Sequence, residues 1–255
     1  MRAIVRATAV LGVTVLGLTA CGPLGQEAEA TGPFAGLSGP QIANKAIAAT
    51  KTASSLTLDV NLSASDGDAD GRIRAYMSMD TKGRCAGTLT LGPTGTAEIL
   101  KTDSKVAYMR FDEAFLREQN EGGSAEENAA VLKQLRGRWV ATDVADPSNK
   151  DSLAFCELDA MLADFDTGLT SARRGEETTV GGRKALRLTE SSGGTTTTMY
   201  VATEGKPYLL KIEQKGGEEP GTMSFSAYDK PVPAKKPAAK DILDPDQLGQ
   251  HQSWQ

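Results

Sequence analysis

Histidine is almost missing from this sequence. The single histidine, His251, stands close to the end of the chain, in a stretch that we expect to be loosely ordered. A Ser-His-Asp triad, an HExxH zinc site and most proton shuttles all need histidine inside a folded domain. The sequence also has no G-x-S-x-G motif, no P-loop and no G-x-G-x-x-G after a strand. We therefore expect no catalytic residue and no cofactor, and an enzyme is the least favoured class of function.

An excess of positive charge is also missing. The chain has 28 Lys and Arg against 33 Asp and Glu, which gives a formal net charge of −5. A nucleic-acid-binding domain needs a basic surface, so this class of partner is excluded. The same balance gives no electrostatic attraction to anionic lipids, so any membrane affinity has to come from elsewhere.

Long apolar runs are absent except at the N-terminus. There Arg2 and Arg6 precede an apolar run over about 7–18, which is shorter than the ~20 residues of a membrane span. This is the layout of an export signal, and the small residues before Cys21 form the pattern LTAC of a bacterial lipobox. A transmembrane helix and an ordinary signal with a chance cysteine are the alternatives. We predict cleavage before Cys21 and lipidation of its thiol, which anchors the protein to the extracytoplasmic face of the cell membrane through two or more acyl chains.

Cysteine is scarce, and the three residues present can be assigned in turn. With Cys21 carrying lipid, Cys85 and Cys156 remain in an exported and oxidising setting, so a disulfide is the natural pairing. A redox or metal pair is the alternative. It lacks both a CxxC spacing and a nearby histidine.

Composition divides the chain into four segments. Residues 1–20 are the signal peptide, and residues 21–37 combine the lipidated cysteine with a flexible tether rich in Gly, Ala, Pro and Glu. A folded domain is expected over 38–237, followed by a loosely ordered tail over 238–255.

The folded domain shows mainly a period of two. Leu56, Leu58, Val60 and Leu62 alternate with polar residues, and similar short runs follow through turns rich in glycine. Short links join antiparallel strands, so these runs predict a meander. We expect an α+β fold with one large curved antiparallel sheet of about eleven strands. Helices are predicted at 41–53, 111–119, 125–136 and 151–165.

Aromatic residues make up only 5% of the chain. Many of the side chains on the apolar side of the predicted sheet are instead Ala, Met, Val and Leu, which either line a cavity or form an ordinary core without large rings. Both interpretations stay open. The candidate residues for a ligand cavity are Leu58, Val60, Leu62, Ile73, Met77, Leu89 and Trp139.

One motif hints at a metal. Residues 66–71 spell D-x-D-x-D-G, which is how a calcium loop begins. The twelfth position is Met77 where a bidentate Glu is needed, and the segment lies between two predicted strands instead of two helices. We therefore interpret it as a solvated hairpin turn and expect no metal.

Five short motifs carry a resemblance to a known family. They are VAYMR at 106–110, GRWV at 137–140, VGGR at 180–183, VATEGKPY at 201–208 and FSAYDKPV at 225–232. Together with the lipobox and the alternation of meander and helices, they resemble the actinobacterial lipoproteins of the LppX/LprG type. These belong to the half-barrel class that includes the lipoprotein carrier LolA. The resemblance implies a curved sheet with helices over its concave face, enclosing an apolar cavity that accepts acyl chains.

Two functions follow as hypotheses. The first is a membrane-anchored lipoprotein that holds a lipid or other apolar small molecule in a half-barrel cavity, as a carrier or chaperone of cell-envelope lipids. The second is a cell-surface lipoprotein that binds an unidentified protein and whose half-barrel is filled by its own side chains. A cavity of a few hundred Å³ would favour the first.

Overall fold

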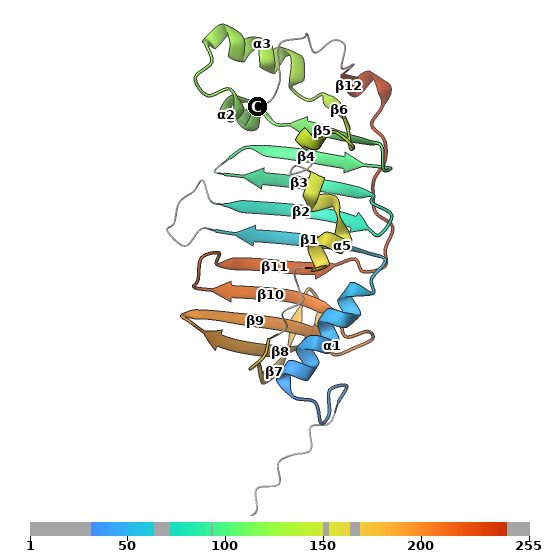
Figure 1. Ribbon diagram of the computed structural model, residues 1–255, viewed down its shortest axis with the longest axis vertical. Helices are drawn as coiled ribbons and strands as arrows, with labels where there is room; N and C mark the ends of the chain where they lie inside the picture. The colour runs from blue at the N-terminus through green and yellow to red at the C-terminus, as the bar shows by residue number, and fades with distance from the viewer. Residues whose placement is uncertain (1–31, 64–71, 93, 150–152, 164–168, 244–255) are drawn as a thin grey trace, which may run out of the picture.

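The computed structural model describes residues 32–63, 72–92, 94–149, 153–163 and 169–243 (Figure 1). Its first half is a meander of hairpins, in which every strand pairs antiparallel with the next. In β1 the side chains of Leu58 and Val60 are buried while Asp59 and Asn61 are exposed, as the alternation predicts. The five strands are β1 (Ser55–Leu62), β2 (Ile73–Asp80), β3 (Cys85–Leu91), β4 (Thr96–Lys101) and β5 (Val106–Phe111).

A second meander forms the other half of the sheet. Gly181 and Gly182 connect its first two strands with φ of 55° and 78°, the left-handed backbone of a two-residue hairpin turn that favours glycine. The pairs are again antiparallel along the chain. The strands are β7 (Arg173–Val180), β8 (Arg183–Ser192), β9 (Thr195–Ala202), β10 (Leu209–Lys215) and β11 (Gly221–Ser226).

The two meanders join into one sheet because the first strand, β1, pairs antiparallel with the last strand of the second meander, β11. At one end β6 (Trp139–Asp143) pairs with β5, and β12 (Ile242–Leu243) adds to β6 in parallel. The order is β12-β6-β5-β4-β3-β2-β1-β11-β10-β9-β8-β7 (Figure 1), with β12 and β7 as separate edges. The sheet is therefore open, and the predicted half-barrel of the α+β class is confirmed.

Helix α1 (Gly39–Lys51) lies across the half of the sheet formed by the second meander (Figure 1). Ser38 begins it with a capping box, in which its hydroxyl accepts from the Gln41 N–H and the Gln41 side chain accepts from the Ser38 N–H. Its apolar face joins the main core cluster of the sheet through Ile42, Ala43, Ala46 and Ile47.

Two further helices cover the end of the sheet near β6. They are α2 (Glu113–Gln119) and α3 (Ala125–Leu135). Leu116, Val131 and Leu135 bury their side chains together with Leu243 of β12 in a second, smaller cluster. This end of the sheet therefore has a core of its own, separate from the main cluster.

The predicted helix over 151–165 takes a different form in its described part. A 3-10 turn, η3 (Ala154–Cys156), precedes the short helix α5 (Leu158–Ala163), and another turn, η2 (Pro147–Asn149), lies before them. Glu157 between η3 and α5 is extended, with φ −100° and ψ 93°, so the chain leaves the helical conformation there and the two short helices are separate. Leu158 and Leu162 pack into the main core cluster, on the same side of the sheet as α1.

The folded part extends beyond the expected boundaries at both ends. Phe34 and Leu37, which we assigned to the tether, pack with the main core, and the Arg174 guanidinium donates to both of their carbonyl oxygens, at 2.9 and 3.2 Å. Leu243, assigned to the tail, is only 3% exposed. Apolar side chains that are isolated in polar stretches carry no periodic signal, which is why composition misplaced both limits.

Candidate functional site

The inner face of the sheet carries six of the seven predicted cavity residues. Leu58 pairs with Met77 and Leu62 pairs with Ile73 across β1 and β2, and directly paired residues point to the same side. All six belong to the main core cluster or pack against it. Leu58 is 3% exposed and Met77 is 1% exposed, so protein atoms cover them. The six are Leu58, Val60, Leu62, Ile73, Met77 and Leu89.

The seventh residue, Trp139, lies on the opposite face. Its neighbour Val140 pairs with Met109 of the main cluster, so Trp139 points the other way. The Arg110 guanidinium lies 4.6 Å from the centre of its indole ring, a cation–π contact, and also binds both oxygens of Glu98. The structure therefore does not bring Trp139 together with the other candidates.

A disulfide fastens η3 to the inner face. Cys85 at the start of β3 bonds to Cys156, with 5.3 Å between their Cα atoms, and both are fully buried. The pairing predicted from the sequence is thus present in the structure. The disulfide holds η3 and α5 over the first meander, while α1 covers the second meander (Figure 1).

A buried lysine lies beside this disulfide. Lys101 pairs with Cys85 across β4 and β3, so it points to the inner face, and its side chain is only 4% exposed. Its ammonium donates to the Glu157 carboxylate at 2.5 Å, directly after Cys156. Glu157 is 52% exposed, so the pair joins a buried cation to an anion at the surface. A buried ammonium needs such a partner because its desolvation is unfavourable.

An apolar groove of about 460 Å³ opens next to Glu157, between α5 and the chain that leaves β6. Its floor includes Leu153, which belongs to the main core cluster, and Val144, which packs against that cluster. The volume falls within the range of small-molecule sites. We call this the α5 groove; it is lined by Val144, Ala145, Asp146, Pro147, Leu153, Ala154, Glu157 and Ala160.

Methionine gathers on the inner side of the sheet. The sequence has seven methionines, and all except Met1, which lies outside the described residues, belong to the main core cluster or pack against it. Methionine has three rotatable bonds and a polarisable sulfur, so a core rich in it can rearrange around a guest with little strain. The six are Met77, Met79, Met109, Met161, Met199 and Met223.

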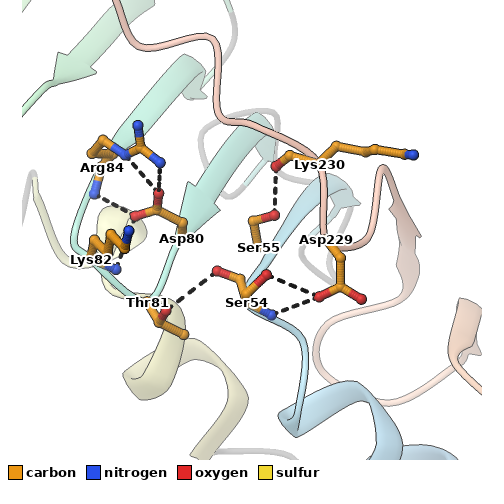
Figure 2. Close-up of polar contacts among 8 residues, drawn as sticks. All are labelled: Ser54, Ser55, Asp80, Thr81, Lys82, Arg84, Asp229 and Lys230. Carbon is orange, nitrogen blue, oxygen red and sulfur yellow. Dashed lines mark hydrogen bonds and ion pairs between the residues drawn. The ribbon is translucent and has the colours of Figure 1, made fainter.

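A polar cluster joins the start of β1, the end of β2 and the segment after β11, and it surrounds a hollow of about 230 Å³ (Figure 2). Asp80 accepts hydrogen bonds from the N–H groups of Lys82 and Arg84 and pairs with the Arg84 guanidinium at 2.7 Å. Asp229 accepts from the N–H and hydroxyl of Ser54, at 2.9 and 3.0 Å. Both carboxylates are thus held by the chain itself, which suits a structural connection between strands.

The electrostatics of Asp229 agree with this role. The Ser54 N–H first, and then the Tyr208 hydroxyl, lower the pKa of Asp229 to about 2. The Tyr208 hydroxyl lies 2.7 Å from the carboxylate, and the Tyr208 ring stacks on Tyr228 with centres 4.0 Å apart. Desolvation raises the pKa of the buried Tyr228 hydroxyl, which donates to the Leu209 carbonyl. Groups held so strongly in one protonation state do not exchange protons near neutral pH.

Several predicted sites lie outside the described residues. These are the lipidation site Cys21, the D-x-D-x-D-G turn at 66–71 and His251. Among the described residues, no group of three His, Cys, Asp or Glu is placed to hold a metal ion. The described helices include none that is both long and apolar enough to cross a membrane.

The sequence analysis did not identify Lys101 and the α5 groove. A signal for Lys101 was present, because Ala97, Ile99 and Lys101 continue one period-two row along β4. The apolar Leu100 on the other face hid this row, so the strand showed no clear inner side. The groove depends on how the chain folds between β6 and α5, for which the sequence has no periodic signal.

Known proteins resemble this chain in structure but not in sequence. Neither a family model nor a curated protein matches the sequence. LprF from Mycobacterium bovis matches over 78% of this chain and 97% of its own, with 13% identity and a TM-score of 0.50. Lipoprotein LppX from Mycobacterium tuberculosis matches over 77% of this chain and 98% of its own, with 12% identity and a TM-score of 0.48. This chain therefore has the fold of lipoproteins of the LppX/LprG type.

Proposed function

We propose that this protein is a lipoprotein, anchored through Cys21, that binds the acyl chain of a lipid or a similar apolar molecule on the concave side of its half-barrel. The observation that carries the proposal is the α5 groove, an apolar hollow of about 460 Å³ that reaches the main core through Val144 and Leu153. Burying apolar surface there would supply the affinity, at about 25 cal/mol per Å². The methionines around the core support this because they can make room for a chain that extends beneath α5.

The lipid anchor fits this role. A domain held near the bilayer by Cys21 would meet acyl chains at high effective concentration. The fold resemblance also implies a ligand of this class. Transfer of envelope lipids at the extracytoplasmic face is the cellular task that we propose.

A binding experiment tests the proposal. The exported chain with Cys21→Ser carries no acyl chain of its own, so lipid found by native mass spectrometry and extraction is bound ligand. We expect co-purifying lipid and saturable uptake of a fluorescent fatty acid. Ala160→Trp, which fills the α5 groove from an exposed position of α5, should weaken uptake about tenfold or more.

The matched control is Ala163→Trp, on the same helix but outside the residues that line the groove. It should leave uptake unchanged. Equal uptake by both variants would show that the ligand does not use the groove. Absence of any co-purifying lipid together with absence of uptake would reject the proposal.

The second candidate function is binding of a protein partner, with the half-barrel filled by its own side chains. The observation in its favour is that the inner face at Leu58 and Met77 is already covered by protein. A negative outcome of both lipid experiments would favour this function.

A further inference from the structure

Lys101 is a charged residue that is buried on the apolar inner face of the sheet. It stands on the inner face of β4, in the same row as Ala97 and Ile99, and its side chain is 4% exposed. A lysine whose only task was to hold a surface segment could do so from an exposed position, without giving up its hydration. The position of Lys101 is therefore informative about what the inner face accepts.

The partner of Lys101 is well placed for exchange. Glu157 is 52% exposed and also lines the α5 groove, so the residue that pairs with the buried ammonium is in contact with the apolar hollow. If another carboxylate arrived through the groove, Glu157 could turn to water at little cost. The ammonium would remain paired throughout, so the exchange would avoid an uncompensated buried charge.

We infer that the site selects acyl chains that end in a carboxylate: the chain occupies the α5 groove and the carboxylate replaces Glu157 on the Lys101 ammonium. This inference rests on the proposed function and adds the chemical class of the ligand. Charge complementarity carries it, because the groove supplies apolar walls and Lys101 supplies a cation that already binds the carboxylate of Glu157, a residue of the groove wall.

The test compares palmitate with its methyl ester, which has the same chain and no charge. Titration of the exported Cys21→Ser protein by calorimetry or by displacement of a fluorescent fatty acid gives the ratio of the two affinities. We expect palmitate to bind at least about tenfold more tightly. In Lys101→Met the ratio should fall toward one, while affinity for the ester is kept.

Two further variants separate this role from a structural one. Lys105→Met removes an equal charge from an exposed lysine in the turn after β4 and should leave the ratio unchanged. Glu157→Gln removes the competing carboxylate, so it should raise affinity for palmitate several-fold and raise the ratio of palmitate to ester affinity with it. If the Lys101–Glu157 pair only stabilised the fold, Lys101→Met and Glu157→Gln would both lower the free energy of unfolding. Neither variant would then change the ratio of the affinities for palmitate and its methyl ester.

The outcomes distinguish the inference from the function on which it rests. Tight binding of both ligands with equal affinity overturns the inference and leaves the proposed function standing. A preference for palmitate that persists in Lys101→Met also overturns it. Failure of the original protein to bind either ligand rejects the proposed function itself. If Lys101→Met does not fold, the ratio in the original protein and the response of Glu157→Gln decide.

Discussion

The side chain of Asp229 connects several segments of this fold through its hydrogen bonds. It stands after β11 with a left-handed backbone (φ 58°), a conformation that Asp adopts more readily than most residues. Its carboxylate joins Ser54 before β1 to Tyr208 before β10, and Lys206 lies 3.6 Å away. Three segments that are far apart in the sequence therefore converge on one charge.

Asp229→Asn should lower the free energy of unfolding at pH 7 by about 1 kcal/mol, because hydrogen bonds to a carboxylate are stronger than those to an amide and the site is partly exposed. The pKa of Asp229 in the folded protein is about 2, below the 3.8 of a free aspartate. Its stabilisation is thus complete above about pH 4 and is lost as the pH falls toward 2. Denaturant unfolding at several pH values should show the two proteins converging over that interval.

The matched control is Asp59→Asn, at an exposed position of β1. Its unfolding free energy should stay within about 0.5 kcal/mol of the original value at every pH. A difference for Asp229→Asn that stays constant between pH 4 and pH 2 would contradict the assignment of the pKa.

For single residues, the sequence predicted the face of the sheet correctly where apolar and polar side chains alternate clearly. The pairs Leu58–Met77 and Leu62–Ile73 lie on the predicted side because each strand has one clearly apolar row. Trp139 lies on the other face because its strand, WVATD, offers no such contrast, and the Arg110 guanidinium gives the ring a partner there. Which face a strand buries is decided by register with its neighbours, and register is a tertiary property.

Among the elements, η3 and α5 depend most on bonds outside themselves. Together they are too short to be stable helices in isolation. The Cys85–Cys156 disulfide and the Lys101–Glu157 pair attach their shared end to the sheet. The long helix predicted over 151–165 is interrupted at Glu157, where these two attachments meet, so tertiary bonds decided the local structure.

Replacing both cysteines by alanine, Cys85→Ala with Cys156→Ala, should lower the free energy of unfolding by about 2–4 kcal/mol, because the bond closes a separation of 71 residues. Amide hydrogen exchange should accelerate most in residues 154–163. The amides of β8 and β9 should exchange at rates closer to those of the original protein. Mass spectrometry of exchanged peptides measures both. Exchange that accelerates equally in all strands would show that the disulfide stabilises the whole domain without a specific effect on η3 and α5.

The whole molecule is one sheet built from two meanders. Six residue pairs connect β1 to β11, and the main core cluster contains residues of both meanders. The sequence predicted the hairpins, whose turns are local. It did not predict this connection or the parallel pairing of β12, since two strands far apart in the chain leave no local pattern.

Because of this connection, the two halves should unfold together. The chain has two tryptophans, so Trp254→Phe leaves Trp139 as a reporter near one edge of the sheet. Trp139→Phe with Trp254→Phe and Tyr200→Trp places the reporter in β9 near the other edge. Fluorescence in each variant and circular dichroism should give the same midpoint in urea. Midpoints that differ between the two reporters would show that the meanders are separate folding units.

The pairing of β1 with β11 also sets an order in time. Ser54 and Asp229, which meet at this junction, are 175 residues apart, so nearly the whole domain must emerge before the two strands can meet. Until then β1 has a free edge with unpaired N–H and C=O groups beside apolar side chains, a state prone to aggregation. Among the antiparallel pairs, the one in the middle of the finished sheet is thus the last to form as the chain is made, and a chaperone that protects the chain before it folds would be needed most at β1.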